Sequence, residues 1–598
     1  MSSMTTRAAR PLPPPDVDAP SREARRLSSL LEVSQALSGT LNLKSSLHRV
    51  LEILARHHGA VRGIVSILDE NGDVLGQSLG LPLFLGNLEI CVKLAAEMFG
   101  WDAFRPGDVF YMNDSYMTGT HLNDATIFGP IYWQDRLVGF SATRAHWLDV
   151  GGKDAGGPMD SREIYQEGMR WGPTRIYDRG EPRDDIIDLL RRNGRFGYSL
   201  VGDMNAQVAA CRTGEARFRA ILDRFGYETY VQARDEIYRQ SEQLEREAVA
   251  AVPDGTYQAS GFLDNDGLGH GPIPVKLRID IEGEQMTIDL DGTSPQMEGP
   301  VNCGFAQTVS ACRVAFKLLI NPDRPVDGGT FHTLDVKAPK ASIMDAQEPA
   351  ACQWYFSSLG LLIDLVVTAL APVLPDKVAA AHFGDSMVMF LAGRDDRRGG
   401  RPFLHVMPHA GGWGGFEGGD GEDGLINNVN GGFKDYPVEV FEVKYPAMIR
   451  RYEFRPDTGG PGRFRGGCGL RRRFDVESES SLYLWLERSV TPGWGLFGGG
   501  DAVGPDVVVN DGRQDELHIL KVNAHPLAPA SVVDLMTGGG GGFGPPFERD
   551  PERVRTDVLD GYVSRDAAAK DYGVALDDEL AVDWPATERL RATGSRTA

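Results

Sequence analysis

At 598 residues the chain is too long to fold around one hydrophobic core, so we expect several packed units. Hydrophobic residues make up 41% and charged residues 24% of the chain, which is typical of a soluble globular protein. The formal net charge of −22 argues against nucleic acid and against an anionic membrane as partners.

The start of the chain and its cysteines indicate a cytoplasmic protein. Residues 1–25 begin MSSMTTRAARPLPPPD and lack the apolar segment of a secretory signal, so we expect a disordered tail. The longest apolar run, GLLIDLVVTALAPVL, is interrupted by Asp364 and Pro372 and predicts a buried helix, because it is too short to span a bilayer. The cysteines form no CxxC pair, which predicts mostly buried, reduced thiols. They are Cys91, Cys211, Cys303, Cys312, Cys352 and Cys468.

The first predicted elements are two helices within residues 24–58, the second of which has apolar residues at three- and four-residue spacing. A strand over residues 63–69 follows and is closed by the turn ENGD. From about Gly76 the chain alternates between strands and turns rich in Gly, Pro and Asp.

A β-hairpin is the most informative predicted element. Its strands cover residues 127–133 and 137–145. His121 and Asp124 lie just before the first strand, and His146 lies at the end of the second. Because a hairpin brings the outer ends of its strands together, we expect these three side chains at one place.

The rest of the chain contains both helices and strands. Asp160 with Glu163 resembles a capping box that opens a short helix, and a long charged helix is predicted around residues 205–250. Residues 256–345 and 436–530 are strand-rich. Near the end, the Asp550-Pro551 pair predicts a helix start, and Gly561 and Gly573 are placed to end two short helices.

Glycine is over-represented, at 72 residues, and it occurs in three clusters. The first, HAGGWGGFEGGDGEDG (409–424), predicts flexible loops. The other two, GGPGRFRGGCG and TGGGGGFG, predict tight turns and close approach of backbones.

Two imidazoles and a carboxylate suit Zn²⁺, Mn²⁺ or Fe²⁺ and leave positions open for water or substrate. The alternative is that His121 and His146 cap turns while Asp124 pairs with Arg144, because polar residues often fill turns. The residues alone leave both interpretations open.

Other catalytic patterns are weaker. The stretch PVDGGTFHTLDV (325–336) resembles a phosphate loop of actin-like ATPases, but no second nucleotide motif accompanies it, so we expect a turn between strands. The chain has no GxxxxGK[ST] motif and no G-x-S-x-G elbow. If the chemistry uses ATP, we expect the nucleotide on another chain.

Six motifs occur in order along most of the chain. They are MNDSYMTGTHLNDATIFGPIY, RAHWLDVGG, IYQEGMRWGPTRI, GDMNAQVAACRTGEAR, YPVEVFEVKYPAMIRRYEFRPDTGGPGRFRGG and GGGGGFGPPFERDPERVRTDVLDGYVS. Together they resemble the hydantoinase B/oxoprolinase family from about Gly76 to Leu576. The resemblance implies an α+β, multi-unit hydantoinase B-like fold, strand-rich with peripheral helices.

We expect six regions within that fold. They are a disordered tail (1–25), a GAF-like helix-helix-strand segment (26–75), a metal-site region with the hairpin and helices (76–255), a strand-rich middle (256–400), a Gly-rich β region (401–545) and C-terminal helices with a tail (546–598).

The resemblance also implies one half of an ATP-dependent machine. A hydantoinase A-type ATPase partner phosphorylates the substrate, and this chain supplies one divalent metal (Zn, Mn or Fe) through His121, Asp124 and His146. In the cyclic amidases of the family, metal-bound water attacks the activated carbonyl of a hydantoin, 5-oxoproline or lactam. In the related acetone and acetophenone carboxylases, a phosphorylated enol and bicarbonate react instead.

Further site residues are expected around that metal. Asp114 and Asp149 are candidates to orient the ligating imidazoles through their second nitrogens. Asp203, Gln207 and Arg212 are candidates for the wall of the site, so Asp114, Asp149, Asp203 and Arg212 form the predicted catalytic set.

One segment departs from the family pattern. Arg62 stands near the position of an acidic residue that the resemblance gives as a further metal ligand, and Phe84 stands where many relatives have His. Residues 26–75 look like the opening of a GAF sensory domain but are too few to form its ligand pocket, so we expect a structural substitute.

The leading hypothesis is therefore the metal-bearing subunit of an ATP-dependent cyclic-amide hydrolase, in a hetero-oligomer with its ATPase. A subunit of an ATP-dependent ketone carboxylase is the alternative. A non-catalytic scaffold is the third possibility, suggested by Arg62.

Overall fold

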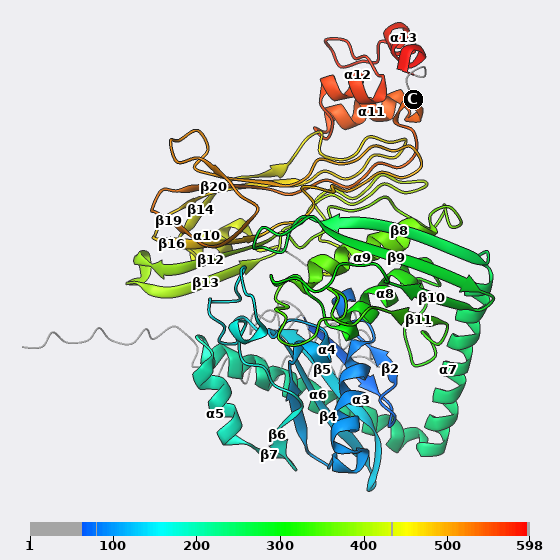
Figure 1. Ribbon diagram of the computed structural model, residues 1–598, viewed down its shortest axis with the longest axis vertical. Helices are drawn as coiled ribbons and strands as arrows, with labels where there is room; N and C mark the ends of the chain where they lie inside the picture. Colours follow the sequence, from blue (N-terminus) through cyan, green and yellow to red (C-terminus); the bar gives the residue numbers. More distant parts are fainter. Residues whose placement is uncertain (1–62, 79, 432–434, 595–598) are drawn as a thin grey trace, which may run out of the picture.

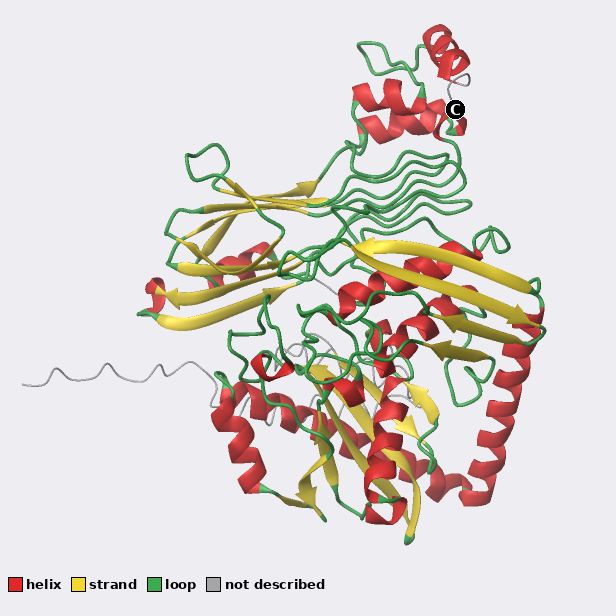
Figure 2. Cartoon of the chain, in the orientation of Figure 1, coloured by secondary structure: helices red, strands yellow, loops and turns green. Residues whose placement is uncertain are grey.

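The computed structural model describes residues 63–78, 80–431 and 435–594. The predicted tail, the two predicted helices and Arg62 lie outside the described residues. The described chain forms four β-sheets with helices packed on them, which confirms the α+β fold class (Figures 1 and 2). No helix in this part of the chain is long and apolar enough to cross a bilayer.

The first unit is a seven-stranded antiparallel sheet with the order β2-β1-β5-β4-β3-β6-β7. Its centre is the predicted hairpin of β4 and β5, in which Asp124 pairs with His146. The strands are longer than predicted, so both residues lie within the ladder rather than beyond it. The strands are β1 (Gly63–Leu68), β2 (Val74–Gln77), β3 (Val109–Met112), β4 (Asp124–Trp133), β5 (Arg136–His146), β6 (Thr174–Asp178) and β7 (Glu181–Pro182).

Helices cover both faces of this sheet. Cys211 of α6 contacts Thr143 of β5 on one face, and Cys91 of α3 contacts Arg144 of β5 on the other. The helix predicted around 205–250 is two helices, because the backbone turns at Gly226 with a φ of 80°. The helices are α3 (Asn87–Phe99), α4 (Ser115–Thr118), α5 (Asp184–Asn193), α6 (Gly197–Phe225) and α7 (Tyr227–Ala250).

The second unit is a four-stranded sheet, β11-β10-β9-β8, packed against α8 and α9 (Figure 1). Side chains of β9 alternate between buried and more exposed positions, as expected for a strand with one face on the core. The apolar run forms the buried helix α9, as predicted. The elements are β8 (Gly255–Leu263), β9 (Ile273–Glu282), β10 (Gln285–Asp289), β11 (Leu334–Lys337), α8 (Phe305–Leu319) and α9 (Tyr355–Leu370).

The third unit consists of two antiparallel sheets, β13-β12-β16-β19 and β14-β15-β20-β17-β18, with a shared apolar core. The elements are β12 (Val388–Asp395), β13 (Arg401–Met407), α10 (Val438–Lys444), β14 (Ala447–Phe454), β15 (Leu470–Val476), β16 (Ser480–Trp485), β17 (Asp506–Val509), β18 (Leu517–His518), β19 (Lys521–Leu527) and β20 (Val532–Met536).

Glycine-rich segments run side by side beyond these sheets without forming strands (Figure 2). Gly540 donates its N–H to Gly467 at 3.0 Å and accepts one from Gly460 at 2.8 Å, so it bonds to two neighbouring segments. A Cβ on Gly540 would collide with the carbonyl of Trp413. The prediction of flexible loops for residues 409–424 is wrong, because much of this cluster is buried in the same bundle, where only glycine allows such close packing.

Three helices follow the bundle at the C-terminal end (Figure 1). Asp550 caps the first of them by accepting the N–H of Glu552 at 2.9 Å, and Gly561 and Gly573 follow the first two helices with positive φ, all as predicted. The helices are α11 (Pro551–Leu559), α12 (Arg565–Tyr572) and α13 (Trp584–Gly594).

Two further predictions have clear outcomes. The six cysteines are all buried and free, as predicted. The short helix expected after Asp160 is wrong: only a 3-10 turn, Ile164–Gln166, forms there, and Glu163 makes no side-chain cap. Asp160 pairs with Lys153 instead.

Candidate metal centre

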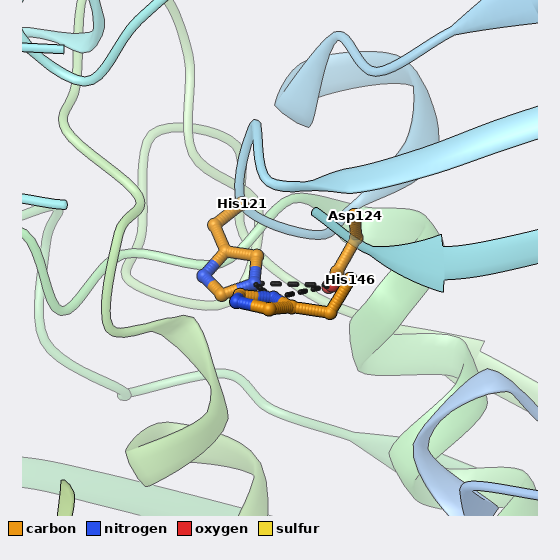
Figure 3. A group of neighbouring side chains, drawn as sticks. All are labelled: His121, Asp124 and His146. Carbon is orange, nitrogen blue, oxygen red and sulfur yellow. Dashed lines mark hydrogen bonds and ion pairs between the residues drawn. The ribbon is translucent and has the colours of Figure 1, made fainter. Parts of the chain in front are cut away.

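The hairpin brings His121, Asp124 and His146 together, as predicted (Figure 3). His121 Nε2 lies 3.1 Å from Asp124 Oδ1, and His146 Nδ1 lies 3.2 Å from the same oxygen. The two imidazole nitrogens are 3.0 Å apart. The side chains of His121 and Asp124 are 6% and 3% exposed and that of His146 is 17% exposed, so solvent reaches the cluster mainly beside His146.

Hydrogen bonding turns a lone pair of His121 toward this cluster. Its Nδ1 lies 3.1 Å from the carbonyl oxygen of Gln353, which can only accept, so Nδ1 carries the proton and Nε2 presents a lone pair. Burial would raise the pKa of Asp124, but its interactions with the two neighbouring imidazoles outweigh burial and lower it, which keeps the carboxylate ionised.

Three electron-rich atoms at such short separations fit a shared cation. An ion about 2.1 Å from three ligand atoms at right angles holds them about 3.0 Å apart, close to the separations in this cluster. Two histidines and one carboxylate on one side of an ion also leave its other positions open. The donor set therefore fits a divalent transition metal.

Tyr355, at the start of α9, completes the surroundings of Asp124. Its hydroxyl donates to Asp124 Oδ2 at 2.7 Å, so Oδ1 is left to face the imidazoles. Burial and the neighbouring Asp124 raise the pKa of Tyr355 well above its usual range, which keeps the phenol protonated as a donor. Its ring packs edge-on against His121 with centroids 5.2 Å apart.

The alternative pairing of Asp124 with Arg144 is wrong. Arg144 is fully buried on the face of the sheet that carries Asp124 and His146. It donates to Thr126 Oγ1 at 2.8 Å, to Asn87 and to Cys91 Sγ at 2.9 Å. The positive charge of Arg144 therefore lies beside the cluster, and the side chains that accept its hydrogen bonds are neutral.

Sequence comparison shows which proteins the chain resembles. The sequence profile of the hydantoinase B/oxoprolinase family matches residues 64–546. The chain belongs to this family. It is 31% identical to the B component of a putative D-/L-hydantoinase from a Pseudomonas strain, over 87% of this chain and 90% of that protein. It is 29% identical to the beta chain of the caprolactamase of Pseudomonas jessenii, over 88% of this chain and 92% of that protein.

Solved structures agree. The ATP-dependent caprolactamase of P. jessenii superposes with a TM-score of 0.83 at 26% identity and covers 95% of this chain and 99% of that chain. An acetone carboxylase superposes with the same TM-score at 19% identity, over 96% of this chain and 84% of that chain, which shows a common fold.

Asp114 and Asp149 do not orient the imidazoles of this hydantoinase B-family chain. Asp114 caps α4 by accepting the N–H of Tyr116 at 3.0 Å. Asp149 accepts the N–H groups of Gly151, Gly156 and Arg195 and so closes the loop that follows β5. Both predictions are wrong because each carboxylate is used by nearby backbone, while a carbonyl from a distant segment holds His121.

Asp203, Gln207 and Arg212 do not line the cluster either. They lie on α6, which covers the opposite face of the sheet. Gln207 accepts from Trp147 and donates to the carbonyl of Ala125, and Arg212 stacks over Tyr177. The prediction was wrong because the motif that carries them packs behind the hairpin.

The two positions that depart from the family have different outcomes. Phe84 is buried in a 3-10 turn, and its ring centroid lies 5.2 Å from the guanidinium carbon of Arg144. Arg62 lies outside the described residues.

The Asp-Gly-Gly-Thr stretch is a structural turn, as predicted, but it connects α8 to β11 rather than two strands. Asp327 accepts the N–H of Gly329 at 2.9 Å and the hydroxyl of Ser241 on α7, and Gly328 donates to Val74 of β2. These contacts join the turn to α7 and β2.

Proposed function

We propose that the chain is the metal-bearing subunit of an ATP-dependent hydrolase of cyclic amides. The observation that carries the proposal is the convergence of His121 Nε2, Asp124 Oδ1 and His146 Nδ1 in a partly open cluster. Its nearly full-length relatives include components of a hydantoinase and of a caprolactamase, whose names refer to cyclic amides.

The chemistry follows from the cluster and its neighbours. A divalent ion held there would lower the pKa of bound water and polarise a carbonyl. Gln353 and Tyr355 hold His121 and Asp124 in place, and the charge of Arg144 lies nearby to favour anionic species. The partner chain would transfer the γ-phosphoryl group of ATP to the carbonyl oxygen of the cyclic amide and release ADP. Addition of water to that carbon then breaks the ring C–N bond with a proton left on the ring nitrogen, and a second water releases the phosphoryl group as inorganic phosphate to give the ring-opened acid.

ATP would act on a partner chain of the hydantoinase A type. The sequence has no GxxxxGK[ST] motif, and its Asp-Gly-Gly-Thr turn is occupied by contacts to α7 and β2. The hydantoinase and caprolactamase relatives are each named as one component of a multi-chain enzyme, which supports a hetero-oligomer.

The test is substrate-dependent ATP turnover by the co-purified complex. Hydantoin, 5-oxoproline and caprolactam form one panel, and acetone or acetophenone with bicarbonate forms the other. Turnover with a cyclic amide, with ring-opened product, is expected. Turnover only with ketone and bicarbonate would replace the proposal with a carboxylase, the candidate supported by a relative named acetophenone carboxylase delta subunit.

A further inference from the structure

One short segment before and within the start of α9 supports two of the three cluster residues. The carbonyl of Gln353 bonds to His121 Nδ1 at 3.1 Å, and the hydroxyl of Tyr355 bonds to Asp124 Oδ2 at 2.7 Å. The positions of these two groups therefore depend on how firmly the backbone at residues 352–355 is held.

Glu167 holds that backbone. Its carboxylate accepts the N–H of Cys352 at 3.0 Å and the N–H of Gln353 at 2.9 Å. It also accepts the hydroxyl of Ser161 at 2.7 Å. The residue is 1% exposed, and burial raises its pKa to about 7.

The segment around Glu167 also contacts the loop that follows the third cluster residue, His146. Ile164 donates to the carbonyl of Pro349 at 3.0 Å, just before the supported segment. Met169 donates to the carbonyl of Val150 at 2.9 Å, in the loop that follows His146. Residues 161–169 thus connect the chain before α9 with the chain after β5.

We propose that Glu167 is a positioning residue for the ion at the His121–Asp124–His146 cluster. It fixes the backbone of residues 352–353 and, through it, the two groups that aim His121 and Asp124. This inference rests on the proposed function, because it assumes that the cluster holds a metal. A carboxylate is required because two N–H groups and a hydroxyl all need acceptors, whereas an amide at this position would turn an N–H toward other N–H groups.

The experiment compares Co²⁺ binding by the apo forms of wild type, Glu167→Gln and Glu163→Gln. Glu163 lies on the same segment, is exposed and makes no side-chain cap, so Glu163→Gln is a matched control. Loss of a group that supports metal ligands weakens binding by about 10- to 100-fold. We expect that loss and an altered visible Co²⁺ spectrum in Glu167→Gln, with both unchanged in Glu163→Gln.

Ser161→Ala keeps the proposal testable if Glu167→Gln does not fold. It removes one donor to Glu167 and leaves both backbone hydrogen bonds, so a smaller loss of Co²⁺ affinity with a shifted spectrum is expected. Wild-type affinity and spectrum in a folded Glu167→Gln would overturn the proposal, as would the same result in Ser161→Ala alongside an unfolded Glu167→Gln. If wild type itself binds no Co²⁺, the proposed function fails first and this inference fails with it.

Discussion

Replacing Tyr355 with Phe removes one hydroxyl from the proposed metal centre and little else. That hydroxyl donates to Asp124 Oδ2 at 2.7 Å in a buried environment. A hydrogen bond to a charged group contributes about 1.5–3 kcal/mol. Since about 1.4 kcal/mol corresponds to a tenfold change, we expect metal affinity to fall about 10- to 100-fold.

The assay is titration of the apo protein with Zn²⁺ or Mn²⁺ followed by calorimetry. Tyr132→Phe is the matched control, because its hydroxyl donates to the carbonyl of Phe104 at 2.8 Å, away from the cluster. The control should bind metal like wild type. Equal affinities of Tyr355→Phe and wild type, with both folded, would refute the role given to Tyr355.

Two further predictions concern stability. Burial raises the pKa of Asp203 from 3.8 to about 7, so the stability of wild type falls as the pH rises between these values. Asp203→Asn should therefore be more stable than wild type by about 1–2 kcal/mol at pH 8, and should have no such advantage at pH 4. Urea unfolding across this range measures the difference, and a constant difference would contradict the reasoning. Gly540→Ala should lower stability by about 3 kcal/mol or more because its Cβ meets the carbonyl of Trp413, whereas Gly202→Ala, in α6 with open space around it, should not. Thermal unfolding of both variants checks this, and equal melting temperatures would count against the close packing of the bundle.

The cluster itself was predictable because its geometry is local. Two strand-like runs separated by a short turn predicted the hairpin, and a hairpin joins His121 and Asp124 to His146 whatever the rest of the chain does. Gln353 and Tyr355 were missed because they lie just before and at the start of α9, more than 200 residues away, and are placed by tertiary packing.

Other errors have similar physical causes. Helical periodicity does not say which face of a sheet a helix will cover, so residues of α6 were placed at the site although they lie behind it. Glycine-rich composition is shared by flexible loops and by tightly packed backbones, so the first cluster of glycines was misassigned. Glu167 gave one sequence signal, because it lies within the motif IYQEGMR. Cys352 and Gln353, whose N–H groups donate to it, gave no such signal.

The most direct test of the account is elemental analysis of the purified chain, together with His121→Ala and His146→Ala. The account predicts about one divalent transition metal per wild-type chain and loss of that metal from both variants while each stays folded. Wild-type protein without stoichiometric metal, or two folded variants that both retain it, would contradict the account.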